Sequence, residues 1–325
     1  MQMNSDKPLT SNIDDENLRH VDHIPDEQIQ NLFDLMGSNV TPPSVLPQFT
    51  PPHKGLVITS LNTKTTYLIG DYLGEGSFGT VYGATDVWKN DLAVKVLKPN
   101  GTYEQVQKAA NNEFTKLLTL RHPNVTYVFD AFEFNHAFYI VTEKCYAPVD
   151  RVFTLSKFTG SLWVRPIARC LLQAINFLHV AGYVHQDIHA GNVFMTFHRN
   201  EMGEPEGDSI TFKLGDLGIT KLFSEIDATN TLLNGSMFPP EFIDPKKYGP
   251  LGHTVDIYHA GLLLMQIIVG KPLTFTYEEI LDGVPRKMAE QLDYPFNIAL
   301  SKALRRRVFE RTQSSLELWN DLNLL

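Results

Sequence analysis

The chain has 325 residues, 43% of them hydrophobic and 20% charged, so it can bury a large core and suits a catalytic unit of one large domain or two lobes. Its formal charge of −9 argues against nucleic acid as an obligatory partner, because phosphate binding usually requires a basic face. Only two cysteines are present, which argues against a disulfide framework, and no apolar run is long enough to span a bilayer. With a polar start and no visible secretory signal, the sequence predicts a cytoplasmic protein without a membrane partner.

The first 54 residues form an acidic, proline-rich extension. Residues 1–60 hold eight acidic and three basic side chains, a net charge of −5, which leaves −4 for the other 265 residues. Residues 1–23 are polar and aperiodic, which predicts disorder. Apolar residues at helical spacing predict one short amphipathic helix near residues 25–36. This helix either docks on the chain's own core or recruits a protein partner.

A β-rich region follows. Alternating apolar residues predict strands at residues 67–69, 80–82 and 92–96, and the turn between the first two contains Gly74, Gly76 and Gly79. Glycine allows backbone N–H groups to approach phosphate closely. Because another strand follows these glycines, where a dinucleotide-binding turn would have a helix, the pattern favours a hairpin lid over a nucleotide.

Lys95 ends the third of these strands. Alone, such a lysine is most simply a solvated residue, but behind a glycine lid a cation is needed to neutralise phosphate oxygens. The next predicted helix, residues 103–120, offers Glu113 or Glu104 as its ion-pair partner. We prefer Glu113 because apolar residues surround it, which indicates an inward-facing position.

Two further strands are predicted at residues 125–143, after which the apolar spacing becomes helical over residues 164–181. A hairpin is predicted from residues 194–197 and 210–214, and the remainder is mostly helical. Arg305, Arg306 and Arg307 are either a docking patch or a solvated helix face.

Between the long helix and the hairpin, the chain reads His185-Gln186-Asp187-Ile188-His189-Ala190-Gly191-Asn192, and Asp216-Leu217-Gly218 comes after the hairpin. Two carboxylates and an amide on loops are suited to holding Mg²⁺ against a phosphate and to orienting an attacking hydroxyl. Asp187 can face the nucleophile, while Asn192 and Asp216 supply oxygen ligands to the metal. The pattern therefore predicts phosphoryl transfer.

Taken in order, these residues resemble the eukaryotic-type protein kinase family from about Tyr67 to the C-terminus. The resemblance implies an α+β, bilobal fold, with a small β-rich N-lobe and hinge at residues 55–145 and a larger, mostly helical C-lobe at residues 146–325. It implies that ATP and Mg²⁺ are the cofactors and that a protein is the substrate. Asp256 would brace the catalytic loop, and Pro240-Glu241 would end the activation segment with Arg311 as the buried partner of Glu241.

The resemblance also assigns roles at single positions. Thr142 matches the gatekeeper, so Glu143 and Cys145 lie in the hinge beside adenine, although Cys145 is otherwise simply a buried small side chain. The catalytic residues implied are Asp187, Lys95, Glu113 and His189, and the metal ligands are Asn192 and Asp216. The residues implied to contact ATP are Gly74, Gly76, Ser77, Phe78, Gly79, Val81, Ala93, Lys95, Thr142, Glu143 and Cys145.

Four positions depart from the family pattern. Gln186 replaces an arginine that receives an activation-loop phosphate in many members, so we expect activity independent of that phosphate. His189 replaces a lysine that touches the γ-phosphate, and it is either a catalytic contact or bonded to the loop backbone. Leu217 replaces phenylalanine as an apolar plug. The segment Asn234–Phe238, where a peptide substrate would dock, is short and altered.

We therefore expect a kinase for serine or threonine hydroxyls of proteins. Two alternatives remain open at this point: a small-molecule kinase similar to aminoglycoside phosphotransferases, which is motivated by His189 and Gly191, and an ATP-binding pseudokinase scaffold.

Overall fold

A computed structural model of the chain describes residues 50–76, 79–98, 102–152, 160–198, 209–217, 220–226 and 238–324. All of them belong to one compact unit, residues 41–325. The predicted helix near residues 25–36 and the predicted disorder before it lie outside the described residues.

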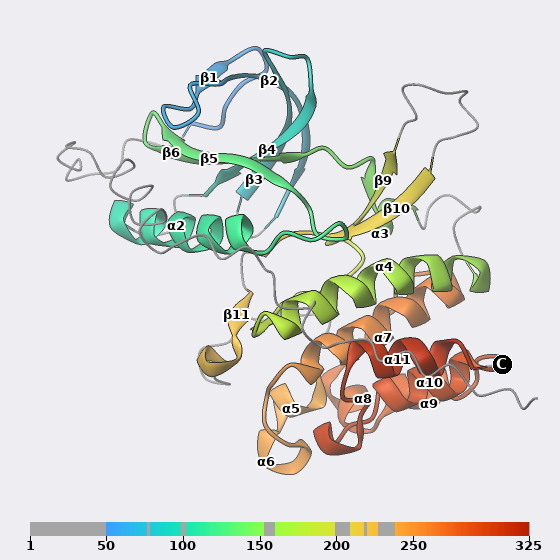
Figure 1. Ribbon diagram of the computed structural model, residues 1–325. Helices are drawn as coiled ribbons and strands as arrows, with labels where there is room; N and C mark the ends of the chain where they lie inside the picture. Colours follow the sequence, from blue (N-terminus) through green and yellow to red (C-terminus); the bar gives the residue numbers. More distant parts are fainter. Residues whose placement is uncertain are drawn as a thin grey trace, which may run out of the picture. The chain divides into compact units, whose positions relative to one another are not determined.

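The N-terminal half of this unit is an antiparallel sheet with strand order β1-β2-β3-β4-β6-β5 (Figure 1). The strands are β1 (Val57–Thr59), β2 (Thr66–Glu75), β3 (Gly79–Asp86), β4 (Asp91–Leu97), β5 (Val128–Phe134) and β6 (Ala137–Glu143). Their inward-facing residues, among them Ile58, Ile69, Val94 and Val141, form a separate hydrophobic core. The predicted strands are confirmed, and β2 reaches further than expected because its pairing with β3 continues through Gly74 and Glu75.

Helix α2 (Tyr103–Thr119) packs against β5 and β6 (Figure 1). Tyr103 fixes its first turn by donating a 2.6 Å hydrogen bond from its hydroxyl to Glu133. Burial and the Glu133 carboxylate both raise the pKa of Tyr103 well above its usual value. The bounds of this helix agree with the prediction.

The C-terminal half is helical. Its elements are α3 (Val149–Val152), α4 (Ser161–Val180), α5 (Pro240–Ile243), α6 (Pro245–Tyr248), α7 (Thr254–Val269), α8 (Tyr277–Leu281), α9 (Val284–Ala289), α10 (Phe296–Ala303), η4 (Val308–Glu310) and α11 (Ser315–Leu322). Helix α7 is buried on all sides, as expected for a central helix, and Gly270 ends it in the left-handed conformation that glycine adopts freely. Helix α4 packs against α7, α11 and β10, so these elements share one core.

In the described part of the chain, five short strands outside the large sheet form two small sheets. The strands are β7 (Ala147–Pro148), β8 (Tyr183–Val184), β9 (Val193–His198), β10 (Ser209–Leu214) and β11 (Lys221–Leu222), and the short helix η3 (Phe223–Glu225) follows β11. The predicted hairpin is β9 and β10, paired antiparallel from Val193 with Leu214 to His198 with Ser209. Strand β8 pairs with β11, so the segment 185–192 is held between two small sheets.

The expected α+β, two-lobed fold is confirmed. None of the helices in the described residues is long and apolar enough to cross a bilayer.

Candidate active site

A fully buried aspartate in the first turn of α7, Asp256, fixes the loop that follows β8. Asp256 accepts hydrogen bonds from the backbone N–H groups of His185 (2.9 Å) and Gln186 (2.8 Å), and His179 of α4 bonds the same carboxylate at 2.8 Å. These bonds hold Gln186 at φ 70°, which a non-glycine residue rarely adopts without such support. The expected bracing role of Asp256 is confirmed, whereas the contribution of His179 was not foreseen.

The charge on Asp256 gives a testable pH dependence. Burial by itself raises the pKa of this carboxyl, but the bond and charge of His179, the charge of His185 and the Gln186 N–H together hold it below the ordinary 3.8. Because its pKa is lower in the folded than in the unfolded state, the ionised Asp256 stabilises the fold at pH values above its ordinary pKa. This stabilisation is lost as the pH falls through the pKa of the folded state. Asp256→Asn should therefore lower the free energy of unfolding at pH 7 by about 1.5–3 kcal/mol.

The measurement is thermal unfolding of both proteins from pH 7 down to pH 3. The difference in stability between the wild type and Asp256→Asn should become smaller below the ordinary aspartate pKa, because the wild-type carboxylate then becomes protonated and loses its charge. A deficit that stays constant across this range would contradict a charged Asp256 in the folded protein.

Asp187 and Asn192 are held together by the tight loop between them. The Asn192 side-chain amide donates to the Asp187 backbone carbonyl (2.9 Å) and to Asp187 Oδ2 (3.0 Å). Asp187 Oδ1 is buried and accepts no hydrogen bond from the part of the chain that the structure describes. His189 Nε2 lies 3.5 Å from that oxygen, a distance that permits an ion pair, but the geometry is not that of a hydrogen bond. Asp187 Oδ1 is therefore available to accept a proton from a bound group.

His189 is tied to the loop backbone at its other nitrogen. The Gly191 N–H donates to His189 Nδ1 at 3.1 Å, so in the neutral ring the proton is on Nε2, which faces Asp187. A Cβ at position 191 would lie 2.9 Å from the nearest imidazole atom, so a larger residue there would displace the His189 ring. Burial alone raises the pKa of Asp187, but the nearby His189 imidazole and the charges of His185 and His259 hold it below its usual value. The carboxylate is thus ionised at neutral pH.

The large sheet and the loop after β10 meet at Lys95 and Asp216. Lys95 Nζ lies 3.0 Å from Asp216 Oδ1, although 121 positions separate the two residues. Asp216 adopts φ 56°, and its preceding residue Gly215 is bonded to both parts of the 185–192 loop: the Gly215 N–H donates to the Asn192 carbonyl at 2.9 Å, and His185 Nε2 lies 3.0 Å from the Gly215 carbonyl. This network brings Lys95, Asp187, Asn192 and Asp216 into one place.

The three glycines of the β2–β3 turn differ in what surrounds them. A Cβ at Gly79 would lie 2.6 Å from the Val96 carbonyl oxygen, so packing against β4 alone requires glycine there. At Gly74 and Gly76 a Cβ would meet no atom of the described residues within 4 Å, and neither residue has a positive φ. Packing and backbone conformation therefore do not explain these two glycines, and the open space beside them suits the close approach of a ligand. Ser77 and Phe78 lie outside the described residues.

Two matched substitutions distinguish the glycine required by packing, Gly79, from a glycine beside open space, Gly76. Gly79→Ala should lower the free energy of unfolding by about 1–3 kcal/mol, because overpacking displaces β4. Gly76→Ala should leave thermal stability nearly unchanged and weaken nucleotide binding. Thermal unfolding with and without Mg-ATP measures both effects, and equal stability of the two variants would contradict the packing role of Gly79.

The residues expected around adenine lie on adjacent strands. Val81 on β3 pairs with Lys95 on β4, and Ala93 pairs with Thr142 on β6, so these positions share one end of the sheet. Ala93 is buried, whereas Val81 and Thr142 are half-buried. The strand register thus keeps the predicted adenine contacts beside the lysine.

The Glu143 side chain has a role that the sequence analysis missed. Lys213 of β10, itself buried, donates to both Glu143 oxygens at 2.7 and 2.8 Å, and the Tyr127 N–H donates to one of them at 2.7 Å. The pair joins the end of β6 to the β9–β10 hairpin. The one hint in the sequence was a lysine, Lys213, within the otherwise apolar end of the strand before Asp216, because a buried lysine needs an acidic partner. The Glu143 carboxylate is therefore occupied by protein groups.

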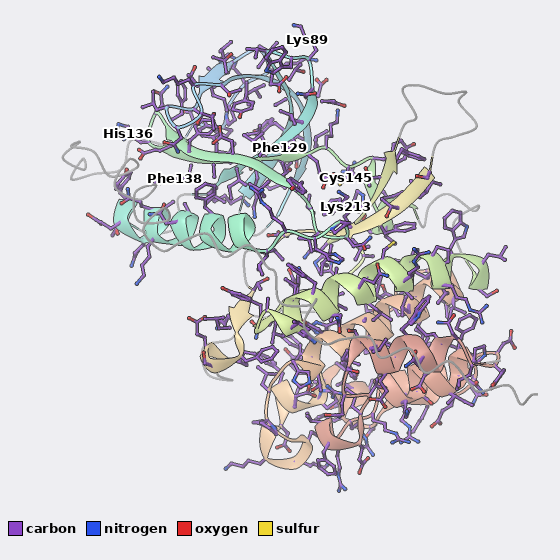
Figure 2. All side chains as sticks on the ribbon, viewed as in Figure 1. Lys89, Phe129, His136, Phe138, Cys145 and Lys213 are labelled. Carbon is purple, nitrogen blue, oxygen red and sulfur yellow. The ribbon has the colours of Figure 1, made fainter. Side chains whose placement is uncertain are left out.

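Cys145 lies beside Lys213 at this connection (Figure 2). Burial, and secondarily the Glu143 charge, raise the pKa of its thiol to about 12. The thiol is protonated at neutral pH, which agrees with a small packed side chain and makes a nucleophilic role unfavourable.

The side chain of Glu113 lies outside the described residues, although its backbone belongs to α2. The choice between Glu113 and Glu104 as the partner of Lys95 therefore stays a prediction.

The residues present fit Mg²⁺ and a nucleoside triphosphate. Asn192 and Asp216 supply an amide and a carboxylate oxygen, which Mg²⁺ accepts together with phosphate oxygens. The described ranges contain no cluster of three or more His, Cys, Asp and Glu suited to a metal, so an all-protein cage is not found there. Lys95 adds a cation beside the same carboxylate.

The end of the predicted activation segment is anchored by a buried ion pair. Arg311 donates from its two terminal nitrogens to the two oxygens of Glu241, each at 2.6 Å, and both side chains are completely buried. Arg311 also donates to the Thr254 carbonyl and lies 4.9 Å from the centre of the Tyr258 ring. The expected pairing is confirmed, as is the burial of Leu217.

Residues 67–312 match the family model of the protein kinase domain. The chain belongs to the protein kinase domain family. Among its relatives, this kinase domain is 28% identical over 65% of the chain to the serine/threonine-protein kinase TIO of Arabidopsis thaliana. It is 28% identical over 63% of the chain to the RAF proto-oncogene serine/threonine-protein kinase of Xenopus laevis, and 25% identical over 78% to the serine/threonine-protein kinase STE20 of Debaryomyces hansenii.

These alignments cover 15%, 31% and 23% of the length of the three relatives, respectively. The shared part is therefore the kinase domain, and the remaining parts of those proteins have no counterpart in the alignments.

Proposed function

We propose that this kinase domain transfers the γ-phosphoryl group of Mg-ATP to serine or threonine hydroxyls of proteins. The observation that carries the proposal is the 3.0 Å contact between Lys95 and Asp216, because it joins the sheet to the loop that holds Asp187 and Asn192. The relatives named as serine/threonine kinases support the choice of acceptor.

Each side chain of the site has a task in this proposal. Lys95 binds the α- and β-phosphates, with Glu113 as its partner, and the backbone around Gly74 and Gly76 covers them. Asn192 and Asp216 hold Mg²⁺, which when bound neutralises charge on the phosphates. Asp187 accepts or orients the proton of the substrate hydroxyl at Oδ1, and His189 holds that oxygen in place. Val81, Ala93 and Thr142 line the adenine site.

We also propose that activity does not depend on a phosphate in the activation segment. Gln186 occupies the position of the phosphate-binding arginine, is fully buried, and neither polar atom of its side chain makes a hydrogen bond to the described residues. A neutral amide cannot form the charge pair that such a phosphate requires. Treatment of the purified protein with a phosphatase should leave its activity unchanged, and a loss of activity would contradict this part of the proposal.

The function is tested by incubating the full chain with Mg-ATP and degenerate peptide libraries whose single acceptor is Ser, Thr or Tyr. Mass spectrometry should detect phosphate on the Ser and Thr libraries and none with Lys95→Met. Phosphate on tyrosine alone would refute the acceptor class. Stabilisation by ATP without transfer to any acceptor would favour a scaffold, and transfer only to small molecules such as aminoglycosides would favour a small-molecule kinase.

A further inference from the structure

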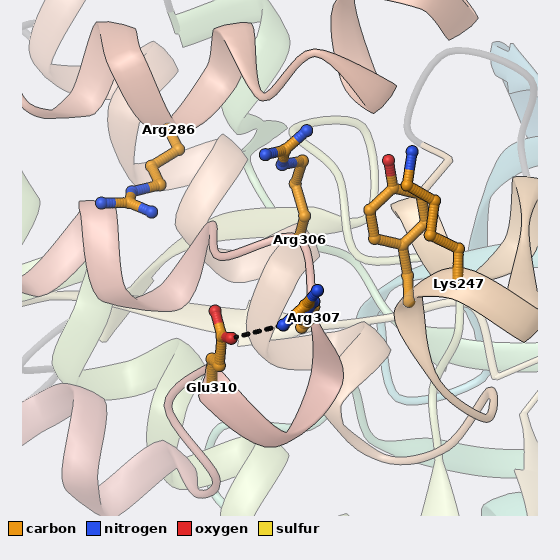
Figure 3. Close-up of a pocket in the computed structure, with 6 residues that line it drawn as sticks. Lys247, Arg286, Arg306, Arg307 and Glu310 are labelled. Atoms are coloured by element: carbon orange, nitrogen blue, oxygen red, sulfur yellow. Dashed lines mark hydrogen bonds and ion pairs between the residues drawn. The ribbon is translucent and has the colours of Figure 1, made fainter.

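A basic pocket lies in the helical lobe, apart from the residues of the candidate active site. It is lined by Lys247, Tyr248, Arg286, Arg306, Arg307 and Glu310 and has a volume of about 230 Å³ (Figure 3). These residues come from α6, α9, η4 and the turn between α10 and η4. The prediction of a solvated helix face for the three consecutive arginines is wrong, since all three lie in that turn.

Tyr248 orders two of the cations. Its ring is buried, and its hydroxyl donates to the Leu281 carbonyl at 3.1 Å. Arg306 donates to the same carbonyl at 2.6 Å, and its guanidinium lies 5.9 Å from the ring centre. The Lys247 ammonium lies 5.1 Å from that ring. The pocket wall is thus built on a fixed aromatic platform.

The lining side chains carry more positive than negative charge. Glu310 is the one carboxylate among the described residues that line the pocket, and it lies 3.4 Å from Arg307, a long distance for a charge-assisted bond (Figure 3). Arg286 is paired with Glu290 outside the lining at 2.9 Å, but both residues are over 40% exposed, so the pair can exchange for another anion at little cost. Arg306 bonds a neutral carbonyl. An anion bound here would relieve the repulsion among these cations.

The chemistry of the pocket suits a phosphate monoester. Guanidinium groups bind phosphate oxygens through paired, charge-assisted hydrogen bonds, and three arginines line this pocket together with a lysine. The pocket volume admits a phosphorylated side chain. An extended polyanion such as RNA or an anionic membrane is disfavoured, because the whole chain carries a formal charge of −9.

The position of the pocket favours a protein ligand. Lys247 and Tyr248 follow α5, which contains Glu241. Arg311 bonds Glu241 and also donates at 3.0 Å to the carbonyl of Arg305, the residue next to Arg306 of the pocket lining. The pocket therefore adjoins the end of the activation segment, the part of the chain assigned to substrate docking by resemblance. A segment of a bound protein can place a phosphorylated residue there.

We propose that this basic pocket binds a phosphoserine or phosphothreonine side chain of a protein substrate, so that the kinase domain prefers proteins that are already phosphorylated. This inference rests on the proposed function in taking a protein as the substrate.

The test measures binding without ATP, by fluorescence anisotropy of the full chain with two labelled degenerate peptide libraries. One library has phosphoserine at its central position and the other has serine. The phosphoserine library should bind at least about tenfold more tightly. Arg286→Gln/Arg307→Gln should abolish this difference, because it removes two of the cations that line the pocket. The fold should persist, because both side chains are exposed and make only exposed ion pairs and, for Arg307, a contact with the exposed Phe309 ring.

Arg165→Gln/Arg169→Gln is the matched control, since it removes the same charge from two exposed arginines on α4. It should retain the preference, and both double variants should unfold at the wild-type temperature. Equal binding of the two libraries, or a preference that survives in the pocket variant or disappears in the control, would overturn the inference. The same holds if the pocket variant loses binding only to an RNA oligonucleotide or to phosphatidylserine vesicles. Because no ATP is used, a failure of phosphoryl transfer refutes the proposed function separately.

Discussion

Asp187→Asn should lower the rate of phosphoryl transfer by about 10²–10⁴-fold, the usual contribution of a positioned general base. The substitution keeps the size of the side chain and an oxygen that can accept the Asn192 amide, so the loop geometry persists. It removes the negative charge of the carboxylate and the proton-accepting capacity of Asp187 Oδ1, the oxygen of this side chain that accepts no hydrogen bond from the described residues. Single-turnover transfer to a Ser or Thr peptide, with Mg-ATP in excess, measures the effect.

The control for this variant is Asp293→Asn, which replaces an exposed carboxylate and should transfer phosphate at the wild-type rate. Stabilisation by Mg-ATP should be similar in both variants, because Lys95, Asn192 and Asp216 are unchanged. Wild-type activity in Asp187→Asn, with intact nucleotide binding, would remove Asp187 from the mechanism.

Arg311→Met should reduce the free energy of unfolding by about 3–5 kcal/mol, because it leaves the Glu241 carboxylate buried without its partner. Both side chains of the pair are completely buried, and Glu241 receives two 2.6 Å bonds from Arg311. For a domain of this size the corresponding fall in the midpoint of thermal unfolding is roughly 10 °C. Thermal unfolding monitored by circular dichroism measures it.

Two comparisons isolate the cause. Lys54→Met breaks an ion pair whose side chains are 68% and 76% exposed, and it should cost less than about 1 kcal/mol. Glu241→Gln/Arg311→Met removes both buried charges and should recover part of the loss, since no unpaired charge is then left in the core. A single variant as stable as the wild type would show that the pair contributes nothing to the fold.

The glycine turn shows how far a motif can be interpreted without coordinates. The spacing of Gly74, Gly76 and Gly79 predicted a lid on a strand hairpin, and the hairpin is present. The motif treats the three glycines alike, however, whereas only Gly79 is in contact with a neighbouring strand at a distance that excludes a Cβ. That difference depends on how closely β4 approaches, which the local sequence does not contain.

The buried polar contacts show the same limit. Glu143 and Cys145 were predicted beside adenine from their position after Thr142, but the engagement of Glu143 by Lys213 depends on a strand 70 residues away. The basic pocket likewise unites α6, α9 and η4, which are remote in the chain. Such sites form only when packed elements bring distant charges together.

The sequence by itself determined the order of strands and helices, the two-lobed α+β fold and the identity of the family, because hydrophobic periodicity and motif spacing are local properties of the chain. The tertiary structure alone decided several charge contacts: Lys95 with Asp216, Glu143 with Lys213, and the cations of the pocket with one another. The physical reason is that the strength of a charge contact depends on distance and burial, and both are set by the packing of the two cores rather than by neighbours in the sequence.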